Sequence, residues 1–151
     1  AIFFYFYENF IHMAKRIHEI HFIFRNANGD DDDDNRKDGD STMRCEIAER
    51  RDPNPPIIFA SRTAVGDEQN GDDIPIDITL DIHQYFNSNE VNGRKRCFIK
   101  IEPEGHDKWR CSCIVQFNWE DGSRSSFNIG PLELGNHDGW VDYRDVVIYG
   151  I

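Results

Sequence analysis

The amino-acid sequence predicts an all-β protein, an antiparallel β-sandwich of the jelly-roll or C2-like kind with about eight strands. Isoleucine and leucine alternate with Pro75 and polar residues from Ile74 to Ile82, and a period of two is typical of a strand with one buried face. Several shorter segments alternate in the same way between turn signals, which favours a sandwich or jelly roll. Only one weak helical pattern accompanies them.

That helical pattern lies in residues 1–12, which we interpret as an aromatic N-terminal extension before a single domain over residues 13–151. Phe3, Phe6, Tyr7 and Phe10 fit one helical stripe, so we expect a short helix or an extra strand packed on the sandwich. The alternative is a peripheral extension, with the natural domain starting near Met13. No basic region precedes the aromatic run, and no small-residue cleavage pattern follows it, so it is a poor signal peptide.

The eight expected strands follow one another at roughly regular spacing. Prolines at 53, 55 and 56 interrupt the pattern, because proline cannot donate to a ladder, and we therefore expect only a short edge strand directly after them. In chain order the expected strands span residues 18–25, 42–49, 57–61, 74–82, 97–101, 109–118, 125–129 and 141–149.

One hairpin can be predicted with its register, because cross-strand partners must share a face. A three-residue loop, Glu120–Gly122, places Val115 opposite Phe127 and Cys113 opposite Ile129, so that the apolar set is buried together. A two-residue turn would oppose these apolar residues with polar ones. We therefore predict the three-residue loop, with its glycine in the left-handed position of a type I turn plus bulge.

The four cysteines, Cys45, Cys97, Cys111 and Cys113, lie on apolar faces of expected strands. We interpret them as buried thiols that act as small hydrophobic side chains. The alternative is disulfide bonding, since a hairpin centred on Gly105 would place Cys97 opposite Cys113. A zinc site is less expected, because no Cys-x₂-Cys pair is present. Reduced thiols without a signal peptide favour a cytoplasmic location.

Charge and length narrow the class of protein further. The chain has 151 residues and a net charge of −11, a length that usually means one domain. Such a negative field repels phosphate backbones, so we expect no nucleic-acid partner. No apolar stretch reaches the roughly 18 residues that a transmembrane helix needs, so no membrane span is expected.

The acidic segment Asp30 to Asp40 is the first candidate site. Calcium prefers six to eight oxygen ligands from a flexible loop, and this segment supplies many carboxylates. The EF-hand pattern fails, because counting from Asp34 places Cys45 where glutamate is required. A calcium site would therefore borrow ligands from a neighbouring loop, such as residues 66–73 or 137–138. The alternative is a solvated acidic loop without an ion. The proposed calcium ligands are Asp30, Asp32, Asp34, Asp38 and Asp40.

The second candidate site is the loop that contains Asn136, His137, Asp138 and Trp140. Sugar-binding sandwiches use such residues, because aromatic faces stack on sugar C–H surfaces while amides and carboxylates hydrogen-bond the hydroxyls. The alternative is that Trp140 covers one end of the core and that Asp138 belongs to an ordinary turn.

A third group consists of Asp77, Thr79, Asp81 and His83, which would share the outer face of one long strand. Two carboxylates and an imidazole there are able to bind a metal or perform acid–base chemistry in a small hydrolase. The more ordinary interpretation is the solvated side of a sheet. No nucleophile motif, phosphate loop or nucleotide fingerprint is present, and the size and composition favour a binding module over an enzyme.

These patterns lead to two functional hypotheses. The first is a calcium-dependent binding module that recognises a glycan or other polar ligand through loops at one end of the sandwich. The second is a structural or self-assembling protein that forms a homo-oligomer through residues 1–12.

Overall fold

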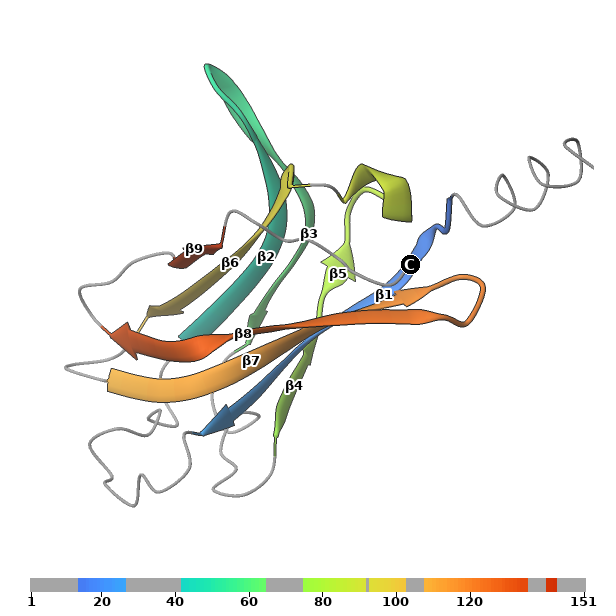
Figure 1. Ribbon diagram of the computed structural model, residues 1–151. Helices are drawn as coiled ribbons and strands as arrows, with labels where there is room; N and C mark the ends of the chain where they lie inside the picture. Colours follow the sequence, from blue (N-terminus) through green and yellow to red (C-terminus); the bar gives the residue numbers. More distant parts are fainter. Residues whose placement is uncertain are drawn as a thin grey trace, which may run out of the picture.

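The computed structural model describes residues 14–26, 42–64, 75–91, 93–102, 108–135 and 141–143 (Figure 1). In this part of the chain, nine strands form two antiparallel sheets. One cluster of buried side chains, drawn from both sheets, fills the space between them. The predicted all-β sandwich is therefore confirmed.

The first sheet has four strands in the order β4-β1-β7-β8. The second has five strands in the order β5-β3-β2-β6-β9, and its β2–β3 hairpin projects beyond the rest of the sandwich (Figure 1). The bounds of the elements are β1 Ile17–Asn26, β2 Thr42–Arg51, β3 Asn54–Ala64, β4 Ile76–Thr79, β5 Asp81–Ile82, the 3₁₀ turn η3 Ser88–Glu90, β6 Lys95–Glu102, β7 Lys108–Trp119, β8 Arg124–Gly135 and β9 Val141–Tyr143.

The core follows the predicted alternation. On β1 the side chains of Ile20, Phe22 and Phe24 are fully buried, because every second residue of a strand points to the same face. At one end of the core, Phe86 packs edge-to-face against Phe117 and Trp119, with ring centroids 6.0 and 6.3 Å apart. This aromatic cluster joins the segment before η3 to the strands of the four-stranded sheet.

The β7–β8 hairpin has the predicted register. Val115 pairs with Phe127 and Cys113 with Ile129. The N–H of Trp119 donates to the carbonyl of Ser123 at 2.9 Å, which leaves Glu120 to Gly122 as the loop. The φ of Gly122, 86°, lies in the left-handed region. The backbone N–H of Gly122 donates to the carbonyl of Trp119 at 3.0 Å and closes the turn. Hairpin parity, read from the apolar residues alone, was sufficient to predict this loop.

The single long strand expected from residue 74 to 82 is wrong. The chain instead forms two short strands that belong to different sheets, because β4 pairs with β1 whereas β5 pairs with β3. The crossing occurs at Leu80, which is buried and whose N–H donates to the carbonyl of Ile20 at 2.9 Å. The apolar alternation continues through the crossing, because both sheets face the same core.

The short edge strand expected at 57–61 is also wrong. It is the eleven-residue β3, which lies inside its sheet between β5 and β2. Pro55 and Pro56 lie in its exposed first residues, where the pairing with β2 is irregular between Glu49 and Arg51. A register shift of this kind accommodates residues that cannot donate to the ladder.

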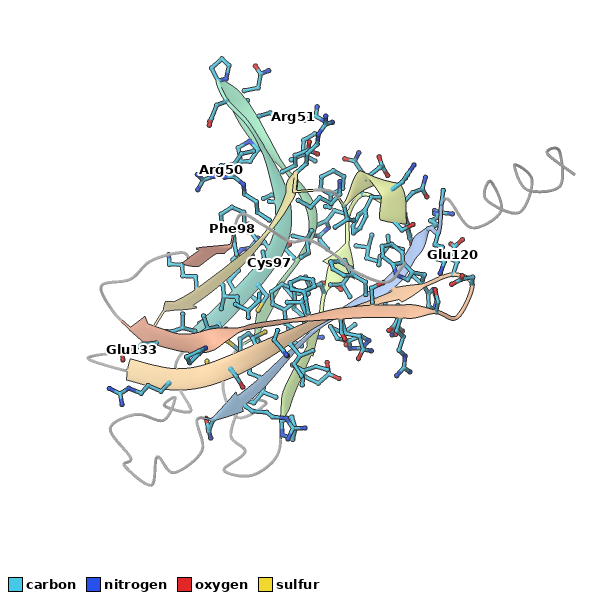
Figure 2. All side chains as sticks on the ribbon, viewed as in Figure 1. Arg50, Arg51, Cys97, Phe98, Glu120 and Glu133 are labelled. Carbon is cyan, nitrogen blue, oxygen red and sulfur yellow. The ribbon has the colours of Figure 1, made fainter. Side chains whose placement is uncertain are left out.

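All four cysteines are buried, as predicted, and they are free thiols. The hairpin that would have paired Cys97 with Cys113 does not form, because β6 pairs with β2 and β9 while β7 pairs with β1 and β8. The chain crosses between the sheets after β6, and Cys97 lies between them (Figure 2). Burial raises the pKa of the Cys111 thiol to about 12, so this thiol is a poor nucleophile.

Candidate functional site

The two loop sites expected from the sequence, and the N-terminal extension at 1–12, lie outside the described residues. Within the residues that the structure describes, no group of three or more His, Cys, Asp or Glu side chains is arranged to hold a metal ion. The site residues outside the described part are Asp30, Asp32, Asp34, Asp38, Asp40, Asn136, His137, Asp138 and Trp140.

The row expected on one long strand is divided between the two sheets. Asp77 and Thr79 lie on β4, whereas Asp81 belongs to β5. His83 Nε2 lies 2.7 Å from the hydroxyl oxygen of Ser61 on β3. The expected acid–base row is therefore wrong, because the crossing at Leu80 separates its two halves.

The half of the row on β4 belongs to a larger polar surface, the outer face of the four-stranded sheet. The strand registers place its side chains in rows that run across β4, β1, β7 and β8. One row is Thr79, His21, Gln116 and Ser126; the next is Asp77, Ile23, Ile114 and Asn128; two flanking rows contain Glu19, Asn118 and Arg124, and Arg25 with Ser112.

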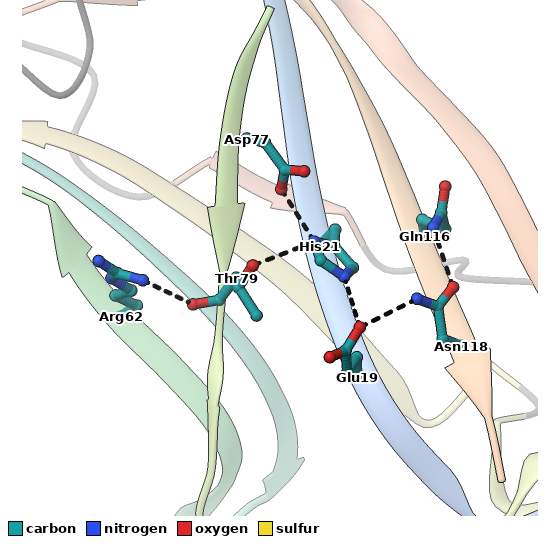
Figure 3. A network of polar contacts seen from close by, with 7 residues as sticks. All are labelled: Glu19, His21, Arg62, Asp77, Thr79, Gln116 and Asn118. Atoms are coloured by element: carbon teal, nitrogen blue, oxygen red, sulfur yellow. Dashed lines mark hydrogen bonds and ion pairs between the residues drawn. The ribbon is translucent and has the colours of Figure 1, made fainter.

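His21 is the centre of a hydrogen-bond network on this face (Figure 3). Its Nδ1 atom lies 2.9 Å from Oδ1 of Asp77 and 3.1 Å from Oγ1 of Thr79. Its Nε2 atom lies 3.0 Å from Oε2 of Glu19, which also accepts a 3.3 Å hydrogen bond from Nδ2 of Asn118. Three strands thus contribute to one network, and both ring nitrogens of His21 are occupied.

The network changes the protonation of its members. Burial lowers the pKa of His21, but hydrogen bonds to Glu19 and Asp77 outweigh burial and raise that pKa above its ordinary value. The hydrogen bond to His21, followed by that from Asn118, lowers the pKa of Glu19. The network therefore favours a charged imidazole between two carboxylates, a structure that orients side chains and leaves no ring nitrogen for proton transfer.

A cavity opens at the other end of the same face. Its volume is about 570 Å³. Polar side chains from three strands line it together with apolar atoms from the middle of β8. The lining residues are Arg25, Asn26, Cys111, Ser112, Asn128, Ile129, Gly130 and Pro131.

The cavity lies where the β7–β8 ladder is irregular, between the pairs of Cys111 and Cys113. Gly130 has a φ of 131°, and a Cβ atom there would lie 3.3 Å from the Cα of Ser112. Glycine is needed because the two strands approach closely with a backbone conformation that other residues rarely adopt. The sequence contained a signal for this irregularity in the pair Gly130-Pro131 inside an alternating segment.

Gln116 and Asn118 are polar residues of this face for which the sequence indicated no role. Their signal was the outward parity of β7, opposite Val115 and Phe117. The sequence did not predict that β7 pairs with β1. The contact between Asn118 and Glu19 joins residues 99 positions apart.

Comparisons with protein-family models, with curated proteins and with solved structures find no match to this chain. In the part of the chain that the structure describes, no helix is long and apolar enough to span a membrane.

Proposed function

We propose that this protein is a binding module that recognises a glycan or a similar polyhydroxylated ligand. The observation that carries the proposal is the outer face of the four-stranded sheet, where polar rows end in a cavity of about 570 Å³. Amide side chains such as Gln116 and Asn128 offer both donors and acceptors, which match the dual character of sugar hydroxyls. The sequence-based hypothesis placed such a ligand at loops instead.

Two further properties of this face support a carbohydrate. Ile23 and Ile114 pair directly and are only half-buried, so they offer apolar surface for sugar C–H groups among the polar residues. The His21 network fixes Glu19 and Asp77 before any ligand arrives, and side chains that are already ordered lose less conformational entropy on binding. Ligand sites commonly combine apolar surface with a few oriented polar groups.

A glycan array tests the proposal, with Gln116→Ala and Asn128→Ala as the informative variants. Both side chains lie on the proposed face, and Asn54→Ala is the matched control, because Asn54 is an exposed residue of the other sheet. We expect wild-type protein and the control to bind the same oligosaccharides and each face variant to bind them at least about tenfold more weakly. Equal binding by all three variants, or no binding by the wild type, would contradict the proposal.

We further propose that calcium supports binding through Asp30, Asp32, Asp34, Asp38 and Asp40, which lie outside the described residues. Packed carboxylates repel one another, and a cation would offset that repulsion. Free calcium at a hundredfold over its dissociation constant would stabilise the fold by roughly 2.7 kcal/mol. The melting temperature should therefore be several degrees higher with calcium than with chelator. The double variant Asp32→Asn/Asp34→Asn should lose this difference. Identical melts would leave a binding module without calcium.

A further inference from the structure

A second cavity, of about 480 Å³, lies between the end of β2, the turn η3 and the start of β6. We call it the charged pocket. It contains charged groups and one amide, and cationic side chains exceed carboxylates by one in a chain whose net charge is −11. Its lining residues are Glu49, Arg51, Asn89, Glu90, Arg94 and Lys95.

Lys95 is the buried member of the pocket, with 2% of its surface exposed. Its Nζ atom lies 4.1 Å from the ring centroid of Phe59 and 5.0 Å from that of Phe86. The same nitrogen is 3.9 Å from Oε2 of Glu49 and donates to the carbonyl oxygen of Glu90 at 3.4 Å. The buried ammonium group is thus held in place by two aromatic faces and two oxygen acceptors.

The two carboxylates of the pocket already have partners. Glu49 is the ion-pair partner of Lys95. Glu90 accepts a hydrogen bond from the backbone N–H of Asn87 through Oε2. Both carboxylates therefore serve the structure of the pocket wall.

The two arginines are different. Arg51 and Arg94 are exposed, and in the described part of the chain neither guanidinium makes a hydrogen bond or an ion pair. Arg51 is the last residue of β2, directly before the turn of the projecting hairpin, and its label in Figure 2 lies on the side opposite that of Arg50. The pKa of Lys95 is lowered, chiefly by burial and to a smaller extent by the positive charges of Arg51 and Arg94. The carboxylates of Glu49 and Glu90 oppose this shift. The two arginines are thus close enough to Lys95 to repel its positive charge.

We propose that the charged pocket binds a small oxyanion, a carboxylate or phosphate group, between Arg51 and Arg94. Guanidinium groups present paired N–H donors whose geometry matches the oxygens of both anions. Asn89 adds an amide donor at the same cavity. The bound anion would offset the mutual repulsion of the three cations. The pocket is separate from the outer face of the four-stranded sheet, so this site does not depend on the proposed glycan function.

Titration calorimetry with inorganic phosphate and with acetate, at constant ionic strength, tests the proposal on the full chain. We expect at least one of the two anions to bind, and Arg51→Gln and Arg94→Gln each to weaken that binding about tenfold. The matched control is Arg124→Gln, because Arg124 is an exposed arginine on β8 outside the pocket. Comparing the two anions distinguishes a phosphate from a carboxylate ligand.

A variant that removes a negative charge from the pocket distinguishes binding in the pocket from a general effect of net charge. Glu49→Gln removes a carboxylate from the pocket wall and releases Lys95 from its ion pair, so we expect it to strengthen anion binding several-fold. Glu133→Gln changes the net charge equally on β8 and should leave binding unchanged. Absence of binding by the wild type to both anions would overturn the proposal. So would equal weakening by Arg124→Gln, or equal strengthening by Glu133→Gln.

Discussion

The two polar regions of this sandwich handle charge in opposite ways. On the outer face of the four-stranded sheet, two carboxylates surround one imidazole, and the half-exposed Glu19 and Asp77 lie next to solvent. In the charged pocket, cations exceed carboxylates, and Lys95 is held inside the molecule against Phe59 and Phe86. Charged side chains are therefore screened by water on the sheet face, whereas Lys95 of the charged pocket is enclosed by the core.

Substitutions in the two regions should therefore have different effects on stability. Solvent-exposed ion pairs contribute little to stability, because water and salt screen them. A buried charge is sensitive to its surroundings, since removing or reversing one partner leaves another uncompensated. We therefore expect the largest changes in stability at the charged pocket and the smallest on the sheet face.

The sharpest test of the comparison is Lys95→Glu. A carboxylate at this position would lie near Glu49 and over the negative faces of two aromatic rings. We expect the free energy of unfolding to fall by about 4–5 kcal/mol, measured by urea denaturation. Lys95→Met is the control, because it retains an apolar stem of similar length and leaves Glu49, whose side chain is 16% exposed, in contact with water. It should cost no more than about 1–2 kcal/mol. Similar losses for both variants would show that burial of charge is not the cause.

The next effect comes from Phe86, which connects the pocket to the core. Its ring packs against Phe59, Phe117 and Trp119 and lies under the ammonium group of Lys95. Phe86→Ala should reduce the free energy of unfolding by about 3–4 kcal/mol, because it leaves a cavity and removes a cation–π contact.

The neighbouring residue provides the control for Phe86. Tyr85 is 53% exposed, and Tyr85→Ala should cost below about 1 kcal/mol in the same denaturation experiment. If the two alanine variants were equally stable, the aromatic cluster would not join this end of the molecule to the core.

On the sheet face, the expected signature is a dependence on pH. The folded-state pKa of His21 is raised, so its protonated form stabilises the fold fully below the unfolded-state value of about 6.5. That contribution is lost as the pH rises through the raised folded-state pKa. Wild type should exceed His21→Gln in unfolding free energy by about 1 kcal/mol at pH 5, and the excess should disappear toward pH 9. A difference that grows with pH would refute this assignment.

The position of Lys95 could be predicted from the sequence only in part. Lys95 has the same strand parity as Cys97 and Ile99, so alternation alone places it on the inner face. Lysine is rarely buried without partners, and the rings that make burial favourable come from β3 and from the segment before η3. Parity was readable from the sequence, but these tertiary partners were not.

The crossing at Leu80 has a similar explanation. Residues 74–82 alternate without interruption, and a strand that leaves one sheet for the other keeps its apolar side chains toward the shared core. Periodicity reports which side faces the core and does not report which sheet a strand joins. The β7–β8 hairpin was predictable, in contrast, because a short loop fixes the partner strand as well as the buried face.

The smallest expected effect concerns the edge of the His21 network. Asn118 donates to Glu19 and accepts a hydrogen bond from Gln116 at 2.9 Å, in a region open to water that can replace either bond. Asn118→Ala should therefore cost only about 0.5–1 kcal/mol in denaturation experiments, while the pKa of Glu19, followed by carboxyl NMR titration, rises toward its ordinary value. Asn128→Ala, on the same face but outside the network, should leave that pKa unchanged. An unchanged pKa in Asn118→Ala would mean that the imidazole alone holds the glutamate ionised.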